Sequence, residues 1–104
     1  MARALWTEAA RADLRSILLE IAEGSGRRAV AKRLGREIRA EARLRAGIPL
    51  GGQTYPELGP GCRGFTFRRW LVVYIPRDDG IEILAVVDGA RDFGQVVRGR
   101  TSEP

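Results

Sequence analysis

The sequence contains no histidine and a single cysteine, Cys62, among its 104 residues. Histidine is the commonest general base near neutral pH, so its absence removes the most frequent proton-transfer group of enzymes. One cysteine cannot form a disulfide within the chain or a thiolate metal cluster, and a Cys–His nucleophile pair is excluded. We therefore interpret Cys62 as a reduced structural residue.

Motifs for nucleophilic catalysis and for nucleotide binding are also missing. Ser16, Ser25 and Ser102 lie in no nucleophile-elbow context. No glycine-rich segment follows a strand-like stretch with the spacing of a dinucleotide-binding turn or a P-loop. The sequence therefore predicts no catalytic residue, no metal and no cofactor, which is typical of a protein that is not an enzyme.

Long apolar runs are absent as well. The longest wholly apolar stretches, such as Trp70–Pro76, are far shorter than the roughly 20 residues that cross a bilayer. The N-terminus lacks the pattern of a secretory signal. A chain of this length forms one domain, for which we expect residues 1–97, followed by a polar C-terminal tail over residues 98–104. We expect a cytoplasmic protein that does not bind membranes.

The charge is strongly basic and is carried almost entirely by arginine. Basic residues number 18 and acidic residues 13, which gives a net charge of +5, and Lys32 is the only lysine. Arginine offers a planar set of donors suited to phosphate and carboxylate groups. This charge is compatible with a solvated surface, a nucleic-acid partner or an acidic protein partner.

The first half of the chain has the apolar spacing of two helices. Thr7 is a plausible N-cap, and the first helix ends at Gly24. The second helix begins after Ser25–Gly26 and ends at Gly47. The apolar positions that define the two helical stripes are Leu14, Ile17, Leu18 and Ile21 in the first, and Val30, Leu34, Ile38 and Ala42 in the second. Together they predict an antiparallel helical hairpin.

Basic residues are concentrated on the outward side of the second helix. They are Arg28, Lys32, Arg36, Arg39 and Arg43. Glu37 and Glu41 are interleaved with them and can pair locally, which favours a solvated helix face over a nucleic-acid-binding stripe.

The second half of the chain has the pattern of antiparallel strands. Residues 47–61, rich in glycine and proline, predict a connecting loop without regular structure. Strands are expected over Arg63–Phe67, Trp70–Ile75 and Ile81–Val87, with turns at Arg68–Arg69 and Arg77–Gly80. The predicted class is α+β, with the N-terminal antiparallel helical hairpin packed on a small, mainly antiparallel β-sheet.

The order of these segments resembles the ParE/RelE toxin superfamily. The residues that carry the resemblance are Leu5–Thr7 leading into Ala10, Asp13, Leu14 and Ile17, then Pro49, Glu57–Arg63, Trp70–Tyr74 and Gly80–Asp92. Each segment is degenerate alone, but their order and spacing over most of the chain are specific. The resemblance implies a small toxin of a type II toxin–antitoxin pair, silenced by an antitoxin that wraps it.

Two branches of this superfamily differ in activity. RelE-like members are ribosome-dependent mRNA endonucleases, with an arginine three residues before the strand tyrosine and usually a second tyrosine near the C-terminus. Here Leu71 stands at the arginine position, and Phe93 follows Arg91–Asp92 with no tyrosine after Tyr74. The resemblance therefore favours the ParE-like branch, whose members are associated with poisoning DNA gyrase. Two positions depart from the ParE-like pattern, with Ala85 in place of an arginine and Asp88 in place of a histidine.

The expected partners are a cognate ParD-like antitoxin, a ribbon-helix-helix protein with an acidic tail, and DNA gyrase. DNA itself is contacted only through the antitoxin. The candidate residues for target contact are Arg63, Arg68, Arg69 and Arg91. The candidate residues for antitoxin binding are Leu18, Ile21, Leu34, Ile38 and Trp70.

Several of these side chains also have structural interpretations. Arg63 is equally suited to an ion pair with Glu82 or Asp88, and Arg91 to an internal pair with Asp92. Trp70 and Tyr74 share one strand face and are expected to pack against the helices, and Trp6 is also a core candidate.

Two alternative functions stay open. The first is a RelE-like ribosome-dependent mRNA endoribonuclease, which would use Arg68 and Arg69 to stabilise phosphate charge. The second is an inactive module that retains only the binding of its antitoxin and DNA.

Overall fold

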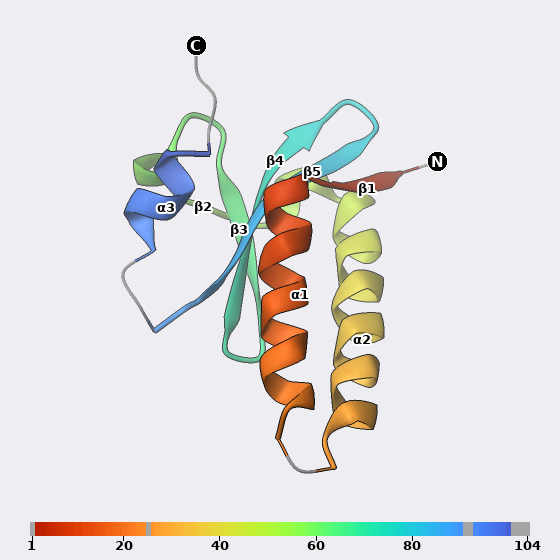
Figure 1. The fold of residues 1–104 in the computed structure, drawn as a ribbon. Coiled ribbons are helices and arrows are strands. Elements are labelled where there is room, and N and C mark those ends of the chain that lie inside the picture. The colour runs from red at the N-terminus through yellow and green to blue at the C-terminus, as the bar shows by residue number, and fades with distance from the viewer. Residues whose placement is uncertain (1, 25, 91–92, 101–104) are drawn as a thin grey trace.

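A computed structural model, which describes residues 2–24, 26–90 and 93–100, shows a five-stranded sheet with a helical hairpin on one face (Figure 1). The strand order is β1-β5-β4-β3-β2, with β1 parallel to β5 and every other pair antiparallel. The elements are β1 (Arg3–Trp6), α1 (Glu8–Ala22), α2 (Arg28–Ala46), the 3-10 turn η1 (Pro49–Gly51), β2 (Gln53–Thr54), the 3-10 turn η2 (Pro56–Leu58), β3 (Arg63–Phe67), β4 (Trp70–Arg77), β5 (Gly80–Asp88) and α3 (Gly94–Arg98). The predicted α+β class and arrangement are confirmed.

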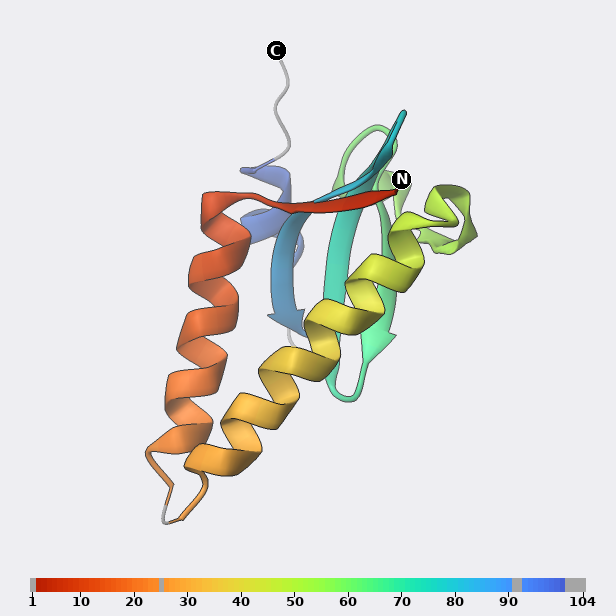
Figure 2. The same cartoon turned by 90° about the vertical axis from the view of Figure 1, so that its right-hand side faces the viewer.

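Both long helices form where the apolar spacing predicts them. The Thr7 Oγ1 atom accepts a hydrogen bond from the backbone N–H of Ala10 at 3.1 Å, which caps α1 as expected. Figure 2 shows that α1 and α2 form a V whose arms meet at the hairpin turn. In the same view β1 crosses between the open ends of the V, so the two helices and β1 frame a triangular region.

The sequence interpretation missed β1 and β2. The four residues of β1 pair in parallel with Gly80–Ile83, at the far end of the chain, so no local pattern indicates the strand. The segment 47–61 was expected to lack regular structure, and this is wrong at the 3-10 turns η1 and η2 and at Gln53–Thr54. These two residues form β2 because they pair with Arg63 and Gly64 at the edge of the sheet.

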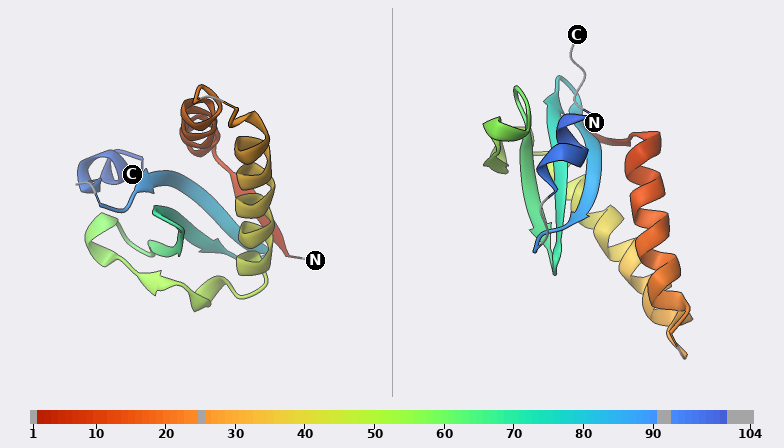
Figure 3. Two further views of the ribbon diagram at one scale, coloured as in Figure 1. Left: turned by 90° about the horizontal axis from the view of Figure 1, so that it is seen from below. Right: turned by 60° about the vertical axis from the view of Figure 1, so that its left-hand side comes forward.

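The two faces of the sheet carry separate apolar clusters. The cluster between the sheet and the hairpin includes Leu14, Ile38, Val72, Tyr74 and Ile83. Trp6 and Trp70 pack against this cluster, which confirms their predicted core positions. Figure 3 shows that the opposite side of the sheet faces α3 and the loop before β3. The cluster on that side consists of Leu58, Cys62, Leu71, Val73, Leu84, Ala85 and Val97.

A β-bulge in β5 separates the part of this strand that pairs with β1 from the part that does not. Val73 pairs with Ala85, whereas the next residue, Tyr74, pairs with Ile83, so Leu84 is an extra residue in the ladder. The last β5 residue paired with β1 is Ile83. Beyond Ile83, the backbone groups on the side of β5 that faces away from β4 therefore need partners other than a strand.

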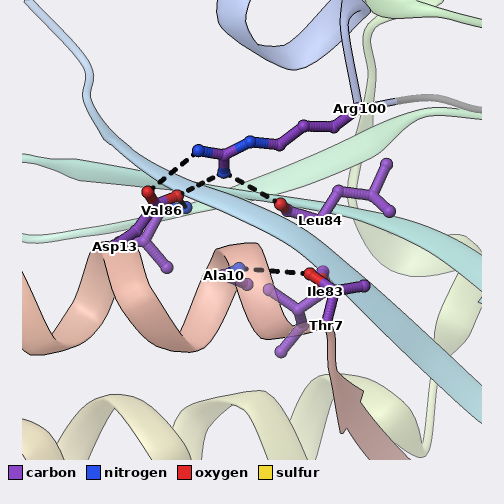
Figure 4. A network of polar contacts seen from close by, with 7 residues as sticks. All are labelled: Thr7, Ala10, Asp13, Ile83, Leu84, Val86 and Arg100. Carbon is purple, nitrogen blue, oxygen red and sulfur yellow. Dashed lines mark hydrogen bonds and ion pairs between the residues drawn. The ribbon is translucent and has the colours of Figure 1, made fainter.

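Side chains supply these partners (Figure 4). The Asp13 carboxylate, on α1, accepts a hydrogen bond from the Val86 backbone N–H at 3.0 Å. It also accepts two from the Arg100 guanidinium, at 2.5 and 3.1 Å. Arg100 Nη1 donates in addition to the Leu84 carbonyl at 3.1 Å. The hydrogen bond with Asp13 raises the pKa of Arg100 above its usual value, so this cation stays charged.

The described structure continues past residue 97, the expected end of the domain. Arg98 is the last residue of α3, and Arg100 joins α1 to β5. Of the polar tail expected over 98–104, residues 101–104 lie outside the described part of the chain.

Replacing Asp13 by alanine tests this attachment. We expect Asp13→Ala to lower the free energy of unfolding by about 2 kcal/mol, because it leaves the partly buried Val86 N–H without an acceptor. Asp79→Ala is the control, since its contact with Arg3 at 3.9 Å is exposed and contributes at most about 0.5 kcal/mol. Urea unfolding measures both values. Equal losses in the two variants would contradict the assigned role of Asp13.

Candidate functional site

The turn between β3 and β4 presents two arginines to solvent. The Arg68 and Arg69 side chains are 60% and 68% exposed. Arg68 has a φ of 55°, the left-handed conformation that a two-residue hairpin turn requires. The guanidinium groups lie 5.4 Å from the Phe67 ring and 5.8 Å from the Trp70 ring, respectively. The expected exposure of this pair is confirmed.

Carboxylates hold both arginines in place. Arg68 Nη2 lies 2.7 Å from the Glu37 carboxylate on α2, and Arg69 Nη2 lies 2.5 Å from the Asp88 carboxylate at the end of β5. The hydrogen bond with Asp88 raises the pKa of Arg69 above its usual value. The turn is therefore anchored to the helical layer on one side and to β5 on the other.

The other two target-contact candidates are placed differently. Arg63 does not pair with Glu82 or Asp88, so that expectation is wrong. Its Nη1 atom donates to the carbonyls of Leu50 and Gly52, both at 2.9 Å, and this links β3 to the preceding loop. The reason is the fold of that loop, which brings its free carbonyls to the head of β3. Arg91, with its expected partner Asp92, lies outside the described residues.

Tyr74 is a fully buried structural residue. Its hydroxyl donates to the Pro49 carbonyl at 2.8 Å and accepts from the Gly52 N–H at 3.0 Å. A Cβ atom on Gly52 would lie 2.4 Å from the Tyr74 hydroxyl oxygen, so only glycine fits there. The Tyr74 hydroxyl therefore makes both of its hydrogen bonds to backbone groups of the loop before β2, and it is shielded from solvent.

The five antitoxin-binding candidates do not form one surface. Leu34 and Ile38 are 6% and 1% exposed in the core, because the same apolar stripe that predicts the helix packs on the sheet. Ile21 and Trp70 line a cleft of about 560 Å³ between α1 and the ends of β4 and β5. Leu18 lies on another side of α1, where it lines a separate groove. The assignment of these five residues to antitoxin binding stays a prediction.

That groove is lined mainly by apolar surface. We call it the hairpin groove; it has a volume of about 610 Å³ and lies between α1, α2 and β1. Its principal apolar residues are Leu5, Trp6, Leu18, Leu19 and Ala22, and its cationic residues are Arg11, Arg15, Arg28, Lys32 and Arg39. Leu5 and Leu19 are 42% and 56% exposed, so apolar surface in the groove faces solvent.

Of the residues that line this groove, the sequence interpretation named only Leu18 as a binding candidate, because it followed the buried stripe of each helix. At about 100° per residue, Arg11, Arg15, Leu18, Leu19 and Ala22 share the opposite side of α1 from Asp13. A second apolar face flanked by cations was the available signal, and it was not used. β1, which closes the groove, was not predictable from local pattern.

Five of the cationic side chains of α2 lie on one face of the helix, and the carboxylates Glu37 and Glu41 lie outside that face. Both carboxylates do pair along the helix, but with other cations than the five expected: Glu41 lies 2.8 Å from Arg45, and Glu37 lies 4.0 Å from Arg33. The five exposed cations of the predicted outward face, however, fall within an arc of about 80°, and both carboxylates lie outside it. None of these five forms an ion pair with a described carboxylate. The structure thus has an uninterrupted cationic stripe where the sequence indicated an interleaved one.

Other features that could indicate a reactive site, a metal site or a membrane span are either structural or not found among the described residues. Cys62 is buried in the cluster beneath α3, and burial raises the pKa of its thiol, which disfavours the nucleophilic thiolate. Among the described residues, no group of three or more His, Cys, Asp or Glu side chains is placed to hold a metal ion. No described helix combines the length and apolarity needed to span a membrane.

Comparison with known proteins identifies the family. Residues 4–93 match the family described as ParE toxin of type II toxin-antitoxin system, parDE. The chain belongs to the ParE toxin family. It is 29% identical to Toxin ParE3 of Caulobacter vibrioides over 101 residues, which cover 97% of this chain and all of that protein.

A solved structure shares the ParE fold. The chain resembles a structure titled "Chromosomal ParDE TA system from P. aeruginosa" with a TM-score of 0.70 and 22% sequence identity. The match covers 85% of this chain and 96% of the other. The fold predicted from the resemblance is therefore confirmed by family and by structure.

Removing the Tyr74 hydroxyl tests its structural role in this ParE-family chain. We expect Tyr74→Phe to lower the free energy of unfolding by about 2 kcal/mol, because the buried Gly52 N–H and Pro49 carbonyl each lose a partner. Tyr55→Phe is the matched control, since no hydrogen bond of the half-buried Tyr55 hydroxyl is found among the described residues. Chemical denaturation monitored by tryptophan fluorescence measures both. A Tyr74→Phe effect no larger than that of the control would show that the hydroxyl is not structural.

Proposed function

We propose that this chain is the toxin of a type II toxin–antitoxin pair that acts by binding DNA gyrase and not by catalysis. Its cognate antitoxin is a ribbon-helix-helix protein with an acidic tail, which covers the toxin until it is degraded. Both partners act in the cytoplasm, and DNA is contacted only through the antitoxin. Membership of the ParE family supports the proposal.

The placement of Tyr74 carries the non-catalytic part of the proposal. A general acid or base must reach the proton that it transfers in the substrate complex. The Tyr74 hydroxyl is buried and bonded to Pro49 and Gly52, so it has no path to an RNA phosphate. Arg63, at the head of the neighbouring strand, is bound to two backbone carbonyls. These positions favour binding over RNA cleavage.

The β3–β4 turn is the surface that we assign to the gyrase contact. Arg68 and Arg69 are the exposed members of the candidate target set in the described chain, and their ion pairs restrict them before a partner arrives. Preorganised arginines at a protruding turn are typical of protein-binding hot spots, since little conformational entropy is lost on binding.

A supercoiling assay with purified full-length protein and gyrase tests the proposal. We expect inhibition at micromolar protein, and a loss of potency of at least about tenfold for Arg68→Asn with Arg69→Gln, because two arginine contacts are removed. Asparagine is chosen at position 68 because it tolerates positive φ. The control pair, Arg36→Asn with Arg43→Gln, removes the same charge from exposed positions of α2 and is expected to inhibit like the wild type.

Three results would contradict this function. Wild-type protein without effect on gyrase would exclude the assigned target. Codon-phased transcript cuts on translating ribosomes would show the endoribonuclease instead. Harmless overexpression of the chain would show a module that has lost toxicity and only binds its antitoxin.

A further inference from the structure

We propose that Asp88 is a positioning residue of the gyrase contact, whose carboxylate holds the Arg69 guanidinium in the orientation in which the target meets it. This inference rests on the proposed function, since it concerns the turn that we assign to gyrase. It goes further by naming a residue that acts on the contact through another side chain.

The ladder between β4 and β5 brings Asp88 next to Arg69. Trp70, the first residue of β4, is the register partner of Asp88, so the residue before Trp70 lies beside the carboxylate. Arg69 Nη2 donates a hydrogen bond to Asp88 Oδ2 at 2.5 Å. The two residues are 19 positions apart in the sequence, so the strand register creates this pair and local sequence does not.

The backbone holds the Asp88 carboxylate in place. Its Oδ1 atom accepts a hydrogen bond from the Ala90 N–H at 2.9 Å, while Oδ2 accepts from Arg69. The Gly89 N–H donates to the Arg69 carbonyl at 3.0 Å, which joins the turn to the same segment. Rotation of the carboxylate away from Arg69 would also break the bond to Ala90. The acceptor that the guanidinium binds is therefore oriented by the backbone.

Arg69 is restrained on one side and open on the other. Its side chain is 68% exposed, whereas the Asp88 side chain is 17% exposed. Among the described residues, the Asp88 carboxylate is the one hydrogen-bond acceptor of the Arg69 guanidinium, and a guanidinium has five N–H donors. The Trp70 ring lies 5.8 Å from the guanidinium carbon. The remaining donors are thus available to a partner from a group whose position is already set.

The pair affects the orientation of Arg69 more than the stability of the fold. An ion pair with so exposed an arginine contributes little to the free energy of unfolding, because water competes for both charges. A guanidinium held in one orientation, however, loses less conformational entropy on binding than one that rotates freely. The main consequence of the pair is therefore a preorganised contact.

Aspartate supplies what the histidine of the ParE-like pattern does not at this position. A carboxylate is charged throughout the neutral pH range and accepts hydrogen bonds on both oxygens. An imidazole carries no negative charge, and its neutral form has a single acceptor nitrogen. Simultaneous bonds to Ala90 and Arg69 therefore require a carboxylate, so this way of positioning Arg69 depends on Asp88.

A double-mutant cycle in the supercoiling assay, with the full-length protein, tests the inference. Asp88→Asn keeps an acceptor for the Ala90 N–H but turns an NH₂ group toward Arg69, which releases the guanidinium. We expect Asp88→Asn and Arg69→Gln each to lower the inhibitory potency at least about fivefold. The double variant is expected within about twofold of Arg69→Gln, because Asp88 acts through Arg69.

The ion pair at the other end of the same two strands is the matched control. Arg77, the last residue of β4, pairs with Glu82 of β5. Glu82→Gln makes the same charge change as Asp88→Asn, and we expect its potency within about twofold of the wild type. Urea unfolding is expected to give similar stabilities for the two carboxylate variants, so a loss of folded protein does not explain the loss of potency.

Nitrogen-15 relaxation at Arg69 Nε measures the positioning without gyrase. We expect the order parameter of the Arg69 Nε–H bond to be lower in Asp88→Asn than in the wild type, because the guanidinium is no longer held. The order parameter of Arg77 Nε, measured in the same spectra, is expected to stay the same in both proteins.

The outcomes separate this inference from the proposed function. Wild-type potency of Asp88→Asn, additive losses in the double variant, an equal loss in Glu82→Gln or an unchanged Arg69 order parameter would each overturn the role of Asp88. If the wild type inhibits gyrase and Asp88→Asn does so equally, the inference fails and the toxin function stands. If the wild type does not inhibit gyrase, the proposed function fails, even where the Arg69 order parameter falls as expected.

Discussion

The attachment of α1 to the edge of β5 is the contact on which the rest of the surface depends. The Ile83 carbonyl accepts hydrogen bonds from the backbone N–H and the hydroxyl of Thr7, and the Val86 N–H donates to Asp13. These bonds replace the strand that the edge lacks beyond β1, and they fix the rotation of α1 about its axis. Because Asp13 faces β5, the opposite side of the helix must face away from the sheet, and that side lines the hairpin groove.

The cations of this chain fall into two groups with different surroundings. On the sheet, Arg68, Arg69 and Arg100 each have a carboxylate within ion-pair distance, and these pairs hold the β3–β4 turn and the C-terminal segment. In the groove, Arg15 and Lys32 have no ion-pair partner among the described carboxylates. The fold therefore has one face whose cations are paired internally and one face whose cations are exposed to solvent beside exposed leucine side chains.

Local pattern predicted the helices and the antiparallel strands, because each depends on residues close in sequence. As expected, Thr7 caps α1, Gly47 follows the end of α2, and Arg68–Arg69 forms the turn between β3 and β4. The predictions that failed concern contacts between residues that are far apart in the sequence. β1 exists only because β5 lies beside it, and Arg63 binds carbonyls that the loop before β2 brings to it. Among the antitoxin candidates, Leu34 and Ile38 are buried because the periodicity that identifies them as one helix face also packs that face on the sheet.

The most direct test of this account is amide hydrogen exchange at the Val86 N–H of the full chain, compared between the wild type and Asp13→Ala. If Asp13 holds α1 on the edge of β5, this N–H will exchange slowly in the wild type and at least about tenfold faster in the variant, because its acceptor is removed. Exchange at the same rate in both proteins would contradict the account.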